Sequence, residues 1–102
     1  GPAGQVRVWS AGCATGEEAY TLAIVLAEAM GQEAFRERVK IYATDMDDEA
    51  LAKARAAVYT EAEIEGIPAD LVPRYFERVE NGFAFRKECR RQVIFGRHDL
   101  IQ

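Results

Sequence analysis

The sequence predicts an α/β fold built on a parallel sheet that binds a ligand at one edge. Two observations carry this prediction: residues 6–30 and residues 39–58 each read as a strand, a turn and a helix. Two such units in succession imply parallel strands joined by right-handed crossovers. Their turns then lie together at the carboxyl ends of the strands, where open α/β sheets hold their ligands.

The first unit leads from an apolar strand into a helix whose first turn is acidic. Apolar residues recur in that helix at the spacing of one buried face: Ala19, Leu22, Ala23, Leu26, Ala27 and Met30. Gly31 follows where a left-handed helix cap is needed. We expect a capping box, in which the Thr15 hydroxyl and the Glu18 carboxylate each bond the other residue's backbone N–H. This arrangement leaves Glu17 free for a ligand.

The turn before this helix favours a cationic ligand over a phosphate. Gly12 and Gly16 let the backbone approach a nucleotide-type ligand, and a bare helix N-terminus attracts phosphate. Here Glu17 and Glu18 occupy the helix start, so a phosphate would meet like charge. An ammonium group, such as that of S-adenosylmethionine, is favoured instead. Glu17 also disfavours a nicotinamide dehydrogenase, and no Lys-Ser or Lys-Thr pair follows Gly16 to make a P-loop.

The second unit places an acid at the end of its strand. Residues 39–44 are β-rich and lead to Asp45, where dinucleotide-binding folds hold an acid against the two ribose hydroxyls. Met46 offers a soft apolar surface for an adenine ring, although alone it is typical of a core residue. The alternative role for Asp45 is to cap the next helix, but Asp47 fits that position better.

The middle of the chain predicts short helical turns and a hairpin. Pro68 and Pro73 interrupt residues 59–76 and suit the first positions of short helices. Asn81-Gly82 predicts a type I′ turn between two strands.

A third β run, residues 92–96, can return to the parallel sheet. The Asp99 carboxylate after it can accept a hydrogen bond from an adenine amine, and the Leu100 backbone can serve a ring nitrogen. His98 has no identifiable partner and is interpreted as structural. Cys13 lies near two carboxylates, and the sequence offers no identifiable general base for its thiol, so we do not expect this thiol to act as a nucleophile.

The composition narrows the function classes. The chain has 102 residues and a net charge of −4, which argues against a nucleic-acid binder. No apolar run approaches the ~20 residues that span a bilayer, so we expect a soluble, cytoplasmic domain. Two distant cysteines and one histidine do not predict a metal site. Five cationic residues lie close together in the last part of the sequence. They form either a solvated surface or a contact for an acidic partner: Arg86, Lys87, Arg90, Arg91 and Arg97.

Four segments together carry a resemblance to a known family: residues 9–20, which read WSAGCATGEEAY, residues 43–47, residues 52–59 and residues 74–76. In order and spacing they resemble the CheR-type methyltransferases, which use S-adenosylmethionine to esterify glutamates of bacterial chemoreceptors. The resemblance implies a partial Rossmann-like class I methyltransferase sheet over residues 1–102, with an inserted antiparallel β-hairpin subdomain at about 76–95. It also implies the acidic, Glu-bearing cytoplasmic helices of receptors as partners.

The resemblance further implies which residues hold the cofactor. Its methionine part would lie on Ala11 and Gly12, its amino group at Glu17, and its ribose at Asp45; Asp99 and Leu100 match the adenine contacts. We expect a fragment of the cofactor domain that is not active alone, and an open sheet edge through which copies can pair. The alternative function is a non-catalytic signalling module that binds partners through the basic cluster.

Overall fold

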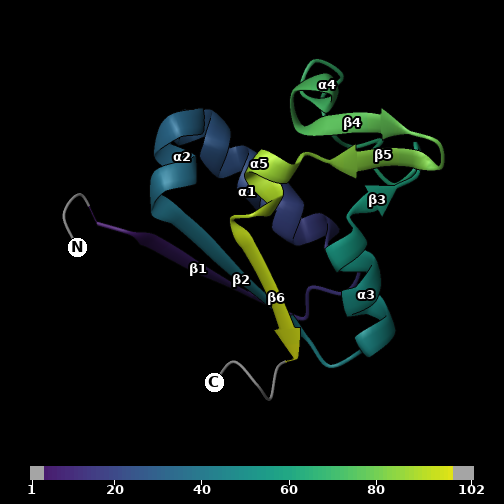
Figure 1. Ribbon diagram of the computed structural model, residues 1–102, viewed down its shortest axis with the longest axis horizontal. Coiled ribbons are helices and arrows are strands. Elements are labelled where there is room, and N and C mark those ends of the chain that lie inside the picture. Colours follow the sequence, from purple (N-terminus) through teal and green to yellow (C-terminus); the bar gives the residue numbers. More distant parts are fainter. Residues whose placement is uncertain (1–3, 98–102) are drawn as a thin grey trace.

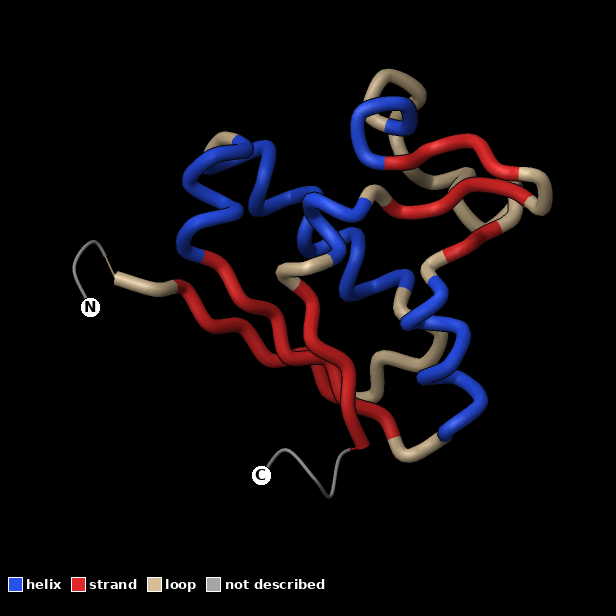
Figure 2. Tube along the Cα trace, in the orientation of Figure 1, coloured by secondary structure: helices blue, strands red, loops and turns tan. Residues whose placement is uncertain are grey.

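The structure is a computed structural model that describes residues 4–97 and arranges them in layers (Figure 1). The parallel sheet contains β1 (Val6–Ala11), β2 (Val39–Asp45) and β6 (Val93–Arg97), in the order β1-β2-β6. Helix α1 (Glu17–Met30) separates this sheet from a second, antiparallel sheet (Figure 2). The predicted parallel sheet and its third strand are therefore confirmed.

Only one face of the parallel sheet is covered in the described residues. Alternation in β1 and β2 directs Val39, Ile41 and Ala43 into the core, against the fully buried Ala19 and Ala23 of α1. The opposite face carries one row of side chains across the three strands. In this row Trp9 pairs with Tyr42, and Tyr42 pairs with Ile94. Trp9 stacks on Tyr42 with ring centroids 4.8 Å apart and stays 58% exposed.

A short helix that we did not predict follows α1. Helix α2 (Gln32–Arg38) begins directly after Gly31 and buries only Phe35. Gly31 has the positive φ that we predicted, 93°, but its ψ of 152° is extended. The predicted left-handed cap is thus wrong in detail, because the chain must turn at once into α2 instead of leaving the helix in a loop.

The second unit ends earlier than its pattern indicated. Helix α3 (Asp48–Ala56) is capped by Asp47, whose carboxylate accepts the backbone N–H of Glu49 at 2.9 Å, as predicted. The helix stops at Ala57, which takes a left-handed conformation with φ of 59°. Val58, interpreted as helical, lies instead in β3 (Val58–Tyr59), because this strand pairs with the distant β5.

The second sheet has the order β3-β5-β4, with β4 (Phe76–Val79) and β5 (Gly82–Phe85) antiparallel. Helix α4 (Val72–Tyr75) precedes it and α5 (Lys87–Arg90) follows it. Pairing ends at Phe85, and Val93 already pairs with Ile41 of the parallel sheet. The segment expected at about 76–95 therefore divides between the two sheets.

The hairpin turn differs from the predicted type. Val79 pairs with Gly82, so Glu80 and Asn81 form the turn, and Asn81 does not have the positive φ of a type I′ turn. Gly82 is needed for another reason. A Cβ there would lie 2.3 Å from the Tyr59 carbonyl oxygen, so only glycine lets β5 approach β3 this closely.

A hydrogen-bond network ties α1 to the start of the second sheet. The Glu28 carboxylate accepts the Tyr75 hydroxyl at 2.6 Å and the Arg74 guanidinium at 2.8 Å. These two donors, the tyrosine foremost, hold the pKa of Glu28 below its ordinary value of 4.5.

Among residues 4–97, no helix is long and apolar enough to cross a bilayer.

Acid is expected to remove the stabilisation that Glu28 provides. Since its pKa is lower in the folded chain, this contribution is complete above pH 4.5 and is lost as the pH falls through the lowered pKa. The melting temperature of Glu28→Gln should therefore lie below that of the wild type at neutral pH and converge with it in acid, measured by thermal unfolding. Glu33→Gln, an exposed carboxylate outside the network, is the control. A gap that does not change with pH would contradict this role.

Candidate functional site at the carboxyl edge of the sheet

The turn between β1 and α1 is held by backbone hydrogen bonds, one of which reaches β2. The Cys13 N–H donates to the Thr44 carbonyl at 2.9 Å, and the Gly16 N–H donates to the Cys13 carbonyl at 2.9 Å. The turn needs positive φ at Gly12, Ala14 and Gly16. Glycine meets this need at two of the three positions without a steric penalty.

The predicted capping box at Thr15 is wrong. Gly16, not Thr15, is the N-cap of α1, and no side chain caps the helix. The Thr15 hydroxyl donates instead to the Glu17 carboxylate, while Ser10 donates to Glu18 at 3.3 Å. The cause is the left-handed Gly16, which moves the helix start one residue beyond Thr15. Glu17 is thus engaged within the turn and lies half-buried.

Asp45 joins the two turns at the sheet edge. It ends β2, as predicted, and its carboxylate accepts the Ala14 N–H at 2.8 Å and the Asp47 N–H at 2.9 Å. These backbone bonds, first that of Asp47 and then that of Ala14, lower the pKa of Asp45 below 3.8. The carboxylate therefore stays ionised at neutral pH. A carboxylate accepts about four hydrogen bonds, so capacity remains for hydroxyl donors from a ligand.

The surface beside Asp45 is open to solvent. A Cβ added at Gly12 would meet nothing within 4 Å, so the space over this turn is free. Ala11 is also exposed, and Met46 shows 70% of its surface to solvent, more than the other exposed large apolar side chains of residues 4–97. Backbone groups, a carboxylate and an apolar side chain thus lie together at one edge, and these groups can contact the polar and apolar parts of a small ligand.

The groups at this edge are suited to ligand binding and not to acid–base or nucleophilic catalysis. Cys13 is buried, and burial followed by the nearby Asp45 charge raises the pKa of its thiol. The thiol is therefore not activated. His98, Asp99 and Leu100 lie outside the described residues.

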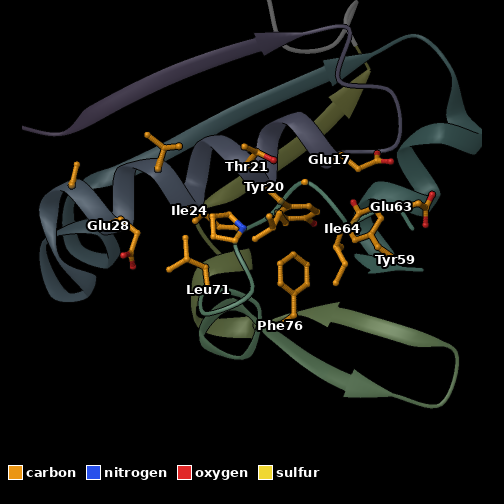
Figure 3. Close-up of a pocket in the computed structure, with 15 residues that line it drawn as sticks. Glu17, Tyr20, Thr21, Ile24, Glu28, Tyr59, Glu63, Ile64, Leu71 and Phe76 are labelled. Carbon is orange, nitrogen blue, oxygen red and sulfur yellow. The ribbon is translucent and has the colours of Figure 1, made fainter. Parts of the chain in front are cut away.

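Glu17 faces a groove that the sequence did not predict. This groove, of about 660 Å³, runs along α1 between the helix and the second sheet (Figure 3). Its walls are mostly apolar and include Tyr20, Ile24, Ile64 and Phe76. The Tyr59 hydroxyl donates to the Thr15 carbonyl at 2.7 Å, so the groove wall contacts the turn itself.

One sequence signal could have revealed the groove. Tyr20 and Ile24 widen the helical face formed by Ala19, Ala23 and Ala27 round one side of the helix. A helix with so wide an apolar face packs against more than one neighbour, here the parallel sheet and the groove walls.

Comparison of the sequence with known proteins finds a matching family model and several similar proteins. The model of the family described as CheR methyltransferase, SAM binding domain, matches residues 2–102. A chemotaxis protein methyltransferase of Salmonella typhimurium is 44% identical over 97% of this chain, and chemotaxis protein methyltransferase 2 of Pseudomonas aeruginosa is 47% identical over 95%. The chain spans 35% of the length of each of these two relatives. It also matches an uncharacterized 104.1 kDa protein of Rhodobacter capsulatus, at 36% identity and over 10% of that protein's length.

Proposed function

Because this chain belongs to the CheR methyltransferase family, matching its domain for S-adenosylmethionine, we propose that it is the cofactor-holding part of an enzyme that methylates glutamate side chains of chemoreceptors. The names of the relatives from Salmonella and Pseudomonas support the chemotactic role. The acidic, Glu-bearing helices of receptors are the proposed partners. The sheet of β3, β5 and β4 is the proposed counterpart of the family's inserted β-subdomain.

The observation that supports this function best is the open edge around Asp45. We assign the ribose hydroxyls to the Asp45 carboxylate, which has lone pairs left after accepting Ala14 and Asp47. The backbone at Ala11 and Gly12 has free space for the methionine part. Met46 would cover the adenine ring, and burial of its exposed side chain would stabilise the complex.

Glu17 is the proposed partner of the cofactor's ammonium group. Its charge has no Lys or Arg partner among the ion pairs of residues 4–97, and the hydroxyl of Thr15 fixes the carboxylate in place. An ammonium group would therefore meet a preoriented negative charge. Asp99 and Leu100 remain the predicted adenine contacts.

S-adenosylmethionine supplies an electrophilic methyl group on a sulfonium. The residues of this chain have the task of positioning, since transfer to a carboxylate requires alignment more than acid–base chemistry. The unactivated Cys13 thiol agrees with this division, because a buried thiol with a raised pKa stays protonated and does not compete for the methyl group.

A chimaera tests the function with a direct readout. This chain would replace the matching segment of the Salmonella relative, and transfer of labelled methyl groups to receptors would be measured. We expect the chimaera to methylate receptors, and Asp45→Ala within it to lower the rate about tenfold or more at limiting cofactor, because the ribose contacts are lost.

Asp70→Ala, an exposed acid on the loop before α4, is the matched control and should leave the rate unchanged. A chimaera that binds the cofactor yet methylates no receptor glutamate would overturn the proposed substrate. Equal loss in the Asp70 and Asp45 variants would overturn the proposed role of Asp45.

A further inference from the structure

Six arginines from four parts of the chain gather around α5, a grouping that the sequence shows only in part. Helix α5 lies between α2 and β5 (Figure 1), and two hollows flank it. We name this region the α5 arginine surface. Its members are Arg36, Arg55, Arg74, Arg86, Arg90 and Arg91.

Most of these cations have no carboxylate partner within residues 4–97. Arg74 is the exception, since it pairs with Glu28 at 2.8 Å. Arg36, Arg55 and Arg86 donate to backbone carbonyls, those of Gln32, Phe95 and Pro73. The guanidinium groups of Arg90 and Arg91 form no hydrogen bond or ion pair within residues 4–97, although the backbone N–H groups of both residues donate to helical carbonyls. Five guanidinium groups thus have no ion-pair partner among the described residues, in a chain whose net charge is −4.

The hollow on the α3 side is the more basic of the two. It has a volume of about 330 Å³ and is lined by Arg55, Arg90 and Arg91, with no acidic residue in its wall. The remaining walls are aromatic and aliphatic, and include the exposed Ile94. Such a hollow suits a side chain with an aliphatic stem and a carboxylate head.

The hollow on the α2 side is also positively charged. It has a volume of about 200 Å³ and brings together Arg36, Arg74 and Arg86, with Glu88 as the acidic member of its wall. Because residues of α5 line both hollows, an extended segment laid across this short helix would place acidic side chains at both.

We propose that the α5 arginine surface docks an acidic polypeptide segment of a partner protein. Guanidinium groups bind carboxylates through paired N–H donors, and five of the six groups have no such acceptor within residues 4–97. A polypeptide fits better than a nucleic acid, because the rest of the surface carries the excess of carboxylates and repels a long polyphosphate. The surface involves none of the residues assigned to the cofactor, so either proposal can fail without the other.

The test measures binding of a fluorescein-labelled poly-glutamate peptide by anisotropy. Arg90→Glu/Arg91→Glu is expected to weaken binding about tenfold or more, since like charges then face each other across the contact. Arg90→Gln/Arg91→Gln should give a smaller loss. The matched control is Arg7→Glu/Arg78→Glu, which makes the same charge change at exposed sites outside the surface and should bind nearly as well as the wild type.

Three results would overturn the proposal. The first is unchanged affinity in the Arg90/Arg91 reversal, and the second is an equal loss in the control reversal. The third is binding of a DNA duplex as tightly as the peptide, which would make the surface a general polyanion site. Thermal unfolding of each variant verifies that the fold is retained, and titration with S-adenosylhomocysteine should give the same affinity in all of them.

Discussion

Gly16→Val is expected to destabilise the chain by about 2–5 kcal/mol, the sum of a left-handed conformation forced on a branched residue and of overpacking. Gly16 has φ of 95°, and a Cβ there would lie 2.9 Å from both the Ala54 Cβ and the Tyr59 hydroxyl oxygen. Ala54 belongs to a helix and cannot give way alone, so α1 and α3 must separate. Urea denaturation measures the loss.

The damage should extend to the turn of the candidate site. Displacement of the Tyr59 hydroxyl breaks its bond to the Thr15 carbonyl, which joins the second sheet to the turn. Gly66→Ala is the control, because Gly66 has no positive φ and a Cβ there meets nothing within 4 Å. We expect it to change the stability by less than ~1 kcal/mol, in either direction. Equal stability of the two variants would contradict the packing described around Gly16.

The second large effect is on ligand affinity and needs no change in packing. Gly12 and Gly4 have nearly the same φ, 69° and 67°, and a Cβ at either meets nothing within 4 Å. Gly12→Ala and Gly4→Ala should therefore cost similar stability, about 1–2 kcal/mol each. Only the first fills the space assigned to the cofactor. Calorimetric titration should show that Gly12→Ala lowers the affinity for S-adenosylhomocysteine about tenfold or more, whereas Gly4→Ala keeps the wild-type affinity.

The features predicted correctly from sequence depend on local patterns. Alternation in residues 39–45 fixes both the strand and the place of Asp45 at its end, and Asp47 caps α3 through its own backbone neighbours. Such signals extend over a few residues and survive folding. The placement of Asp45 and of Gly12 at one edge then follows from the topology of parallel strands.

The features that were missed depend on contacts between distant residues. Thr15 does not cap α1, because the Cys13 N–H donates to the Thr44 carbonyl and Gly16, the residue after Thr15, is left-handed. Val58 became a strand because it pairs with Ala84. No local pattern contains these partners, and propensity yields to tertiary pairing in such cases.

Surfaces assembled from several elements were also beyond the sequence. The basic cluster read along the chain included Arg97, which instead pairs with Asp48 at 3.2 Å, away from α5. Arg36 and Arg55 joined the surface from α2 and α3. The groove along α1 likewise needs walls from residues 59–76. Charge and apolar content can be counted in a sequence, but their convergence depends on the fold.

The most direct measurement of the central claim is a calorimetric titration of the unmodified chain with S-adenosylhomocysteine. The claim is that the edge formed by Ala11, Gly12, Glu17, Asp45 and Met46 holds the cofactor. Saturable one-to-one binding that weakens in Gly12→Ala but not in Gly4→Ala is the predicted result. A folded chain that takes up no ligand, or one whose affinity falls equally in both variants, would contradict the assignment of the cofactor to this edge.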